Sequence, residues 1–104
     1  MLGAIAGDII GSKYEGNPMR TTDFTLFSEP CGYTDDTVCT IAIAWAIMNK
    51  ADYAEALRTF CKRYTAGYGM NFYNWVHNPW ESGPYNSYGN GSAMRVSPVG
   101  FAFD

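Results

Sequence analysis

The sequence predicts an all-α protein, and three observations lead to this prediction. Apolar residues recur at helical spacing in several segments, residues suited to helix caps precede two of them, and the apolar–polar alternation typical of a strand persists nowhere. We expect about four to five helices joined by long loops. Four of them can be placed, at residues 3–12, 36–49, 53–66 and 91–103.

The first expected helix carries a glycine at every fourth position. Gly3, Gly7 and Gly11 therefore fall on one helical face. Because each glycine costs about 1 kcal/mol relative to alanine inside a helix, three of them on one stripe predict that another stretch of backbone packs closely against that face. Residues 16–33, which follow, are rich in turn-forming residues and predict a loop.

The second and third expected helices begin at recognisable caps. Thr34 is an N-cap candidate, and the carboxylates of Asp35 and Asp36 suit the first turn of the helix that follows. A second capping residue, Asp52, precedes the third helix. Gly67 marks the expected end of that helix.

A glycine-rich and aromatic stretch (GYGMNFYNW, residues 67–75) and a polar turn segment (residues 77–92) separate the third helix from the last one. The last helix is expected to begin near Gly91. Pro98 lies within it, and proline removes a backbone donor and clashes with the preceding turn. We therefore predict a kink or a break there.

Composition argues against several functional classes, among them nucleic-acid binding and membrane proteins. The net charge is −3 and the seven Lys and Arg residues are scattered, so no nucleic-acid partner is expected. Three cysteines without a CxxC motif predict free thiols and a reducing, cytoplasmic location. The apolar start lacks a positive region and is interrupted by Asp8, so neither a signal peptide nor a membrane partner is expected.

Oxygen donors gather at two places in the sequence. Thr34, Asp35 and Asp36 lie on one turn, and Glu15 follows the first helix. Taken singly, the threonine and aspartates are explained as a helix cap and the glutamate as a surface carboxylate. Together they are the ligands that a hard cation such as Mg²⁺ takes. Adjacent carboxylates in a cleft also repel each other unless a cation lies between them.

A second candidate region is the loop at residues 87–95 (SYGNGSAMR). An ordinary turn explains it, but its successive amides carry little side-chain bulk, which suits phosphate binding. Several aromatic residues could stack on an adenine. They are Phe72, Tyr73, Trp75 and Tyr88. A metal site, an anion-binding loop and aromatic residues that can stack on a base together predict a phosphorylated nucleotide-sugar substrate.

Four strings in this order resemble the ADP-ribosylglycohydrolase family across the whole chain. They are GAIAGDIIGSKYE, TDDTVCTIAIAWAI, GYGMNFYNW and SYGNGSAMRVSPVGFAFD. The resemblance implies a compact all-helical domain that holds a binuclear Mg²⁺ centre, with Mn²⁺ in some members. It also implies hydrolysis of the bond to the anomeric carbon of the distal ribose, with ADP-ribose or an ADP-ribosylated acceptor as the partner.

The resemblance also assigns roles to residues. The metal ligands it implies are Thr34, Asp35, Asp36 and Glu15, and the last three of these are also the implied catalytic residues. The substrate-binding residues it implies are Gly67, Gly69, Ser87, Tyr88, Gly89, Asn90, Gly91 and Ser92. Met94 and Arg95 match a family hallmark with a structural role, and we expect the arginine to pair with a carboxylate.

The chain also departs from the family pattern. Family members carry a second acidic motif near the C-terminus, of the form Asp-x-Asp-Asp-Thr, and nothing here matches it. Residues 1–104 are therefore expected to form a single partial domain that is inactive alone. A C-terminal half or self-association would cover apolar surface around Trp45 and the glycine stripe.

Two other interpretations stay open. One is a non-catalytic fragment that binds ADP-ribose weakly or serves only as an assembly partner, and the other is an unrelated small helical protein. The sequence also leaves open whether the bond cleaved is to arginine, to serine, to an acetyl ester or to another acceptor.

Overall fold

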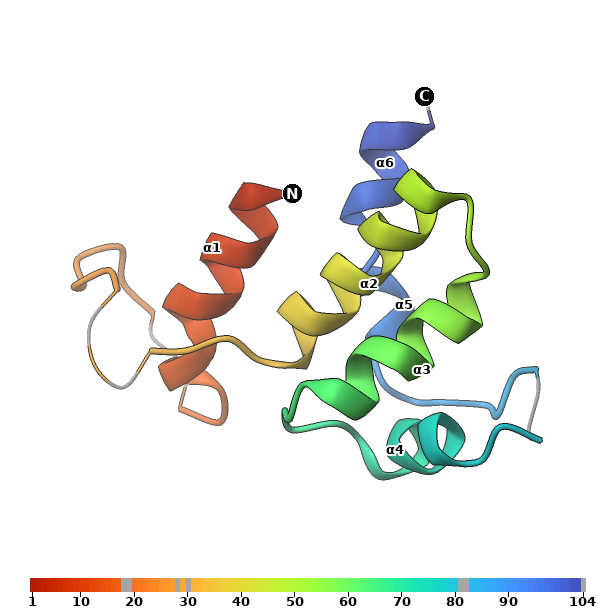
Figure 1. The fold of residues 1–104 in the computed structure, drawn as a ribbon. Coiled ribbons are helices and arrows are strands. Elements are labelled where there is room, and N and C mark those ends of the chain that lie inside the picture. Colours follow the sequence, from red (N-terminus) through yellow and green to blue (C-terminus); the bar gives the residue numbers. More distant parts are fainter. Residues whose placement is uncertain (18–19, 28, 30, 81–82, 104) are drawn as a thin grey trace.

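The computed structural model describes residues 1–17, 20–27, 29, 31–80 and 83–103. Within these residues the fold is all-helical, as predicted, and contains no strand. Six α-helices follow one another, and a short 3₁₀ turn at Ser12–Tyr14 continues the first (Figure 1). Their bounds are α1 Leu2–Gly11, α2 Asp35–Asn49, α3 Tyr53–Arg63, α4 Met70–His77, α5 Gly91–Met94 and α6 Ser97–Ala102.

Helix α2 is the centre of the fold. Helix α3 packs along it and α6 also contacts it, while α4 packs beneath α3 (Figure 1). Helix α1 and the loop that follows it lie on the other side of α2. The described chain is elongated, with extents of 45 × 31 × 24 Å. The molecule thus has two parts, one formed by α1 and the loop that follows it and the other by the remaining helices. The beginning of α2 lies where these two parts meet.

Local sequence chemistry explains where α2 and α3 begin and end. The Thr34 hydroxyl accepts a hydrogen bond from the Asp36 N–H at 3.2 Å, and the Asp52 carboxylate accepts one from the Glu55 N–H at 2.9 Å. Both are N-caps at the predicted positions. Helix α2 ends at Asn49, and its C-cap residue, Lys50, adopts the left-handed conformation with φ of 52°.

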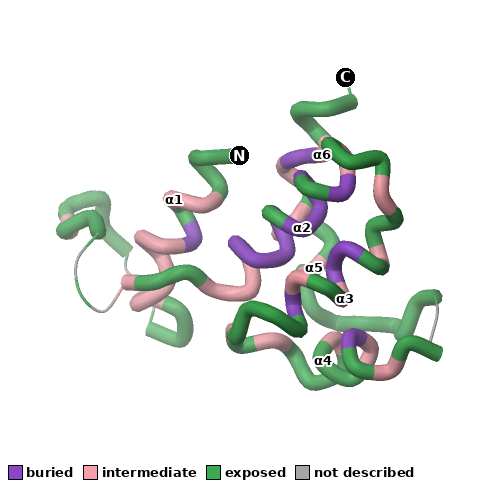
Figure 2. Tube along the Cα trace, viewed as in Figure 1, coloured by how far each residue is buried: buried purple, intermediate pink, exposed green. Residues whose placement is uncertain are grey.

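Small side chains let α2 and α3 approach closely. Buried residues, purple in Figure 2, are concentrated on these two helices. The core comprises Val38, Cys39, Ala42, Ile43, Leu57, Cys61 and Val76. The sulfur atoms of Cys39 and Cys61 lie 3.8 Å apart, and all three cysteines of the chain are free, as predicted. The hydrogen bond to Cys61 and burial both raise the pKa of the Cys39 thiol, so it stays protonated as a core side chain.

Two features of the helices differ from the sequence-based expectation, and a third agrees with it. Helix α3 ends at Arg63, short of Gly67, and Tyr64 is extended with its carbonyl accepting a hydrogen bond from the Tyr68 hydroxyl. Helix α4 was not predicted. The last helix is divided into α5 and α6, with Pro98 in the first turn of α6, so the break expected at this proline is confirmed.

The glycine stripe of α1 does not carry a close backbone neighbour within the described residues. A Cβ built on Gly3, Gly7 or Gly11 would meet no atom within 4 Å. The expected tight packing is therefore not made inside this part of the chain. Trp45 on α2 is 44% exposed, in keeping with the expected apolar surface, and the covering partner stays a prediction. None of the helices described here has the length and apolar character needed to cross a membrane.

Candidate functional site

The start of α2 is anchored to α1 by a residue that the sequence analysis did not place in the site. The carboxylate of Asp8 accepts hydrogen bonds from the Thr34 N–H at 2.8 Å and the Thr34 hydroxyl at 2.5 Å. It also accepts bonds from the Thr37 hydroxyl at 2.6 Å and the Thr37 N–H at 3.2 Å. Asp8 is only 9% exposed. A lone acidic residue in an otherwise apolar helix was the sequence signal for such a buried anchor.

Thr34 joins the anchor to the acidic turn. Its hydroxyl donates to Asp8 and accepts from the Asp36 N–H, so the capping explanation of the TDD motif is confirmed. A hydroxyl has one proton and two lone pairs. One acceptor position of Thr34 therefore stays free, and its role as a metal ligand stays a prediction.

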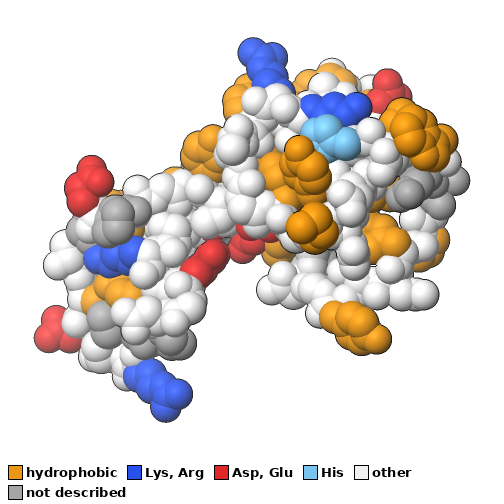
Figure 3. Space-filling model, turned by 90° about the horizontal axis from the view of Figure 1, so that it is seen from below, with side chains coloured by type: hydrophobic (Ala, Val, Ile, Leu, Met, Phe, Trp, Pro, Cys, Tyr) orange, Lys and Arg blue, Asp and Glu red, His pale blue; other side chains and the backbone are white. Residues whose placement is uncertain are grey.

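Carboxylates from three segments influence one another at the start of α2. Burial raises the pKa of Asp36, and the negative charges of Asp35 and Asp8 raise it further. Glu15, exposed just after the 3₁₀ turn, adds to this effect, while Arg95 opposes it. Figure 3 shows acidic side chains at the junction between the two parts of the molecule. The predicted acidic residues are thus brought into one electrostatic environment.

This acidic cluster does not form a closed metal cage. Within the described residues, no group of three or more His, Cys, Asp or Glu side chains is arranged to hold a metal ion. Mg²⁺, however, usually keeps several waters and is held by one or two carboxylates together with substrate oxygens. The repulsion among the carboxylates around Asp36 is also relieved by a cation. The donor set therefore fits a hydrated Mg²⁺ and does not fit an all-protein cage.

The raised pKa of Asp36 predicts a pH-dependent effect on stability. A carboxyl group whose pKa rises on folding stabilises the fold below its unfolded value near 3.8, and this contribution is lost as pH rises through the folded value. Asp36→Asn should therefore unfold at higher urea concentration than the wild type at pH 7 but not at pH 3, both with a chelator present. Asp52→Asn, at the start of α3, is the matched control. A pH-independent difference would contradict this prediction.

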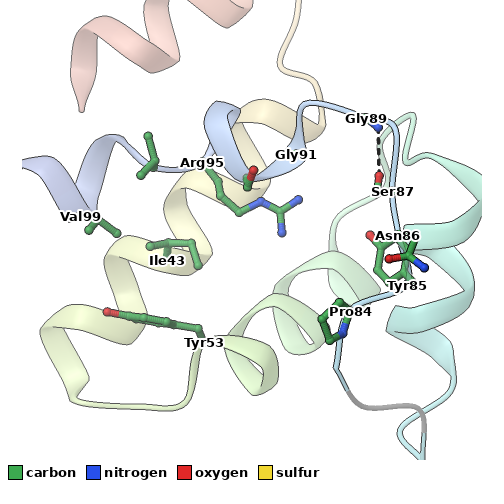
Figure 4. Close-up of a pocket in the computed structure, with 12 residues that line it drawn as sticks. Ile43, Tyr53, Pro84, Tyr85, Asn86, Ser87, Gly89, Gly91, Arg95 and Val99 are labelled. Carbon is green, nitrogen blue, oxygen red and sulfur yellow. Dashed lines mark hydrogen bonds between the residues drawn. The ribbon is translucent and has the colours of Figure 1, made fainter.

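A cavity of about 160 Å³ brings the predicted motifs together. Asp35 of the acidic turn, the glycine turn before α4 and the loop before α5 line it, whereas Thr34, Asp36 and Glu15 do not. Its lining residues are Asp35, Gly69, Phe72, Tyr85, Ser87, Gly89, Asn90, Gly91, Met94 and Arg95. A larger neighbouring cavity of about 470 Å³ shares much of this loop and also contacts Ser92 (Figure 4). Segments more than 50 residues apart in sequence therefore meet at one place.

Some predicted substrate-binding residues lie outside these two cavities. Gly67 lines neither of them, and Tyr88 is fully exposed. Tyr73 packs on His77 with ring centroids 4.2 Å apart, away from the cavity lining. Tyr85 lines both cavities and was missed, although an aromatic residue next to a glycine-rich loop is a signal that could have found it.

The glycine loop differs from the expected amide cradle. Positive φ occurs at Gly16 and Gly83 among the described glycines, and not at Gly89 or Gly91. The Gly89 N–H already donates to the Ser87 hydroxyl at 3.0 Å (Figure 4). At position 91 the guanidinium of Arg95 approaches closely, because a Cβ there would lie 2.8 Å from its Nη2, so any larger residue would require the arginine side chain to shift.

The sequence model of the ADP-ribosylglycohydrolase family matches residues 1–104. The chain belongs to this family. The strings that suggested the resemblance are those that supply the anchor, the acidic turn and the loop of the two cavities. Membership is consistent with the all-helical fold.

Two curated relatives carry the same name. The chain is 28% identical to "ADP-ribosylhydrolase ARH3" of Xenopus tropicalis, over 99% of this chain and 38% of that protein. It is 27% identical to the protein of the same name from Gallus gallus, over 95% of this chain and 37% of that protein. The chain therefore spans about 38% of the length of the curated relatives it matches. No solved structure matches it.

Proposed function

We propose that this chain supplies the N-terminal part of the active site of an ADP-ribosyl-acceptor hydrolase. The observation that carries the proposal is the cavity in which Asp35 meets Gly69 and the loop 87–91. In it, an acidic end suited to a cation adjoins an uncharged loop suited to a sugar and phosphates. The printed name of the relatives, ADP-ribosylhydrolase, points to the same substrate class.

In this proposal Asp35 and Asp36, with Thr34 and Glu15, are the ligands that this chain contributes to two Mg²⁺ or Mn²⁺ ions. Bound divalent cations in such a site lower the pKa of a water molecule and orient substrate hydroxyl groups. Glu15 is exposed and close enough for its charge to affect Asp36. We assign to its carboxylate the transfer of the leaving-group proton.

A second function is favoured by one observation. Because the described residues assemble no set of three acidic, histidine or cysteine ligands, this chain by itself suits binding of ADP-ribose better than hydrolysis. We propose this non-catalytic role as the alternative. Release of ADP-ribose from a modified acceptor, measured for this chain with and without a candidate C-terminal partner, separates the two functions.

The binding step can be tested by titrating ADP-ribose calorimetrically with Mg²⁺ and with a chelator. Gly89→Val should weaken binding by more than about tenfold, because the added side chain occupies the cavity wall. Gly100→Val, at an exposed position of α6 with open space around its Cα, is the control and should bind as the wild type does. Absence of ADP-ribose binding by the wild type, with or without Mg²⁺, would overturn the proposal.

A further inference from the structure

Arg95 is a partly buried cation whose charge acts on Asp36 without forming an ion pair with any described residue. It follows α5, and its Nε is buried and has no hydrogen-bond partner. The guanidinium carbon lies 4.9 Å from the centre of the Phe72 ring. Among the residues that the structure describes, Arg95 makes no ion pair, so the carboxylate partner expected from the sequence is not found there. A buried N–H donor without an acceptor is unfavourable, and an anion that approaches the guanidinium from the cavity would offset part of this cost.

The side chain of Arg95 borders the larger cavity. Figure 4 shows it extending from α5 toward the loop that carries Ser87 and Gly89. Glycine at position 91 leaves the space that the guanidinium occupies, since any Cβ there would lie 2.8 Å from Nη2. The charged group therefore lies between the backbone at Gly91 and the Phe72 ring.

The charge in the lining of the larger cavity is positive. Arg95 is the one charged residue among those described that line its 470 Å³. The remaining polar lining includes Ser87, Ser92 and Asn86, whose hydroxyl and amide groups donate hydrogen bonds. The smaller cavity differs, because Asp35 lines it together with Arg95. An anion would therefore be accommodated in the larger cavity and repelled from the acidic end of the smaller one.

We propose that Arg95 is the counter-charge for a phosphate or diphosphate group bound in the larger cavity. A guanidinium presents several N–H donors in a planar fork that matches phosphate oxygens. This inference rests on the proposed function in identifying the anion as the diphosphate of ADP-ribose. It orients the ligand, with the diphosphate at Arg95 and the distal ribose toward Asp35 and Asp36.

Inorganic pyrophosphate is the direct probe, titrated calorimetrically in the presence of a chelator so that no divalent cation contributes. Arg95→Gln should weaken its binding by about tenfold or more, because a charged hydrogen-bond donor is lost. Arg63→Gln removes an exposed arginine of the same chain and should leave the affinity unchanged. Pyrophosphate affinity within twofold of the wild type in a folded Arg95→Gln variant would overturn the inference.

Two further measurements keep the inference testable if Arg95→Gln does not fold. Arg95→Lys keeps the charge but loses the fork, so its affinity should fall between those of the wild type and the chargeless variant. The wild-type affinity should also fall as salt concentration rises. Pyrophosphate binding that is independent of salt, or stronger in Arg95→Lys than in the wild type, would contradict the role assigned to Arg95.

ADP-ribose, titrated in parallel, separates this inference from the proposed function. If the wild type binds pyrophosphate through Arg95 but does not bind ADP-ribose, the anion site stands and the proposed function fails. If ADP-ribose binds equally well to the wild type and to Arg95→Gln, the proposed function stands and the assignment of Arg95 is wrong. If both ligands lose affinity in Arg95→Gln, both are supported.

Discussion

Asp8→Ala is expected to lower the free energy of unfolding by roughly 3 to 4 kcal/mol, since charged hydrogen bonds are lost and buried donors are left unpaired. The wild-type carboxylate accepts four hydrogen bonds from Thr34 and Thr37. Alanine leaves the backbone N–H groups of both threonines without this acceptor. Urea unfolding followed by circular dichroism measures the loss.

The matched control is the other carboxylate that caps a helix. Asp52 is exposed and accepts one hydrogen bond, from the Glu55 N–H. Asp52→Ala should therefore cost about 1 kcal/mol, as exposed N-caps typically do. If the two alanine variants lose the same stability, Asp8 is no more than an ordinary cap. Asp8→Asn keeps one carbonyl acceptor and should lie between the wild type and Asp8→Ala.

The double substitution Asp35→Asn and Asp36→Asn is expected to weaken Mn²⁺ binding by at least about a hundredfold, because hard cations require the charge of their carboxylate ligands. Helix content should change little, since the cap is formed by Thr34 and asparagine is tolerated in the first turn. Calorimetry or the electron paramagnetic resonance signal of free Mn²⁺ reports the affinity, and circular dichroism reports the helix content.

The control for this experiment removes two carboxylate charges from the start of the next helix. It combines Asp52→Asn, at the N-cap of α3, with Glu55→Gln, in its first turn. This control should bind Mn²⁺ as the wild type does. Equal affinity of the wild type and the α2 variant would remove Asp35 and Asp36 from the metal site, whatever the control shows.

The sequence predicted those parts of the fold that depend on neighbours within one or two turns. Thr34 and Asp52 cap their helices as expected, and Pro98 divides the last helix, because each acts on backbone groups a few residues away. Helix α4 was missed for the opposite reason. Eight residues are too few for a clear period, and Val76 within it is held by the core, at 1% exposure.

In the candidate site, too, the sequence predicted the features that depend on local composition and missed those that depend on packing. The TDD turn and the glycine loop were recognised because their composition alone suggests oxygen ligands and close approach. The environment of Arg95 was not predictable, because the lack of a hydrogen-bond partner for its Nε among the described residues depends on everything packed around it.

The sequence by itself determined the all-α class, the helix caps and the family, since these follow from residue spacing and from short motifs. Only the tertiary structure showed that Asp8 fastens α1 to α2 across 26 residues, and that Asp35 shares a cavity with a loop more than 50 residues away. The physical reason is that a hydrogen bond or a cavity wall requires two groups to be placed together. For residues so far apart, that placement comes from the packing of α2 against its neighbours.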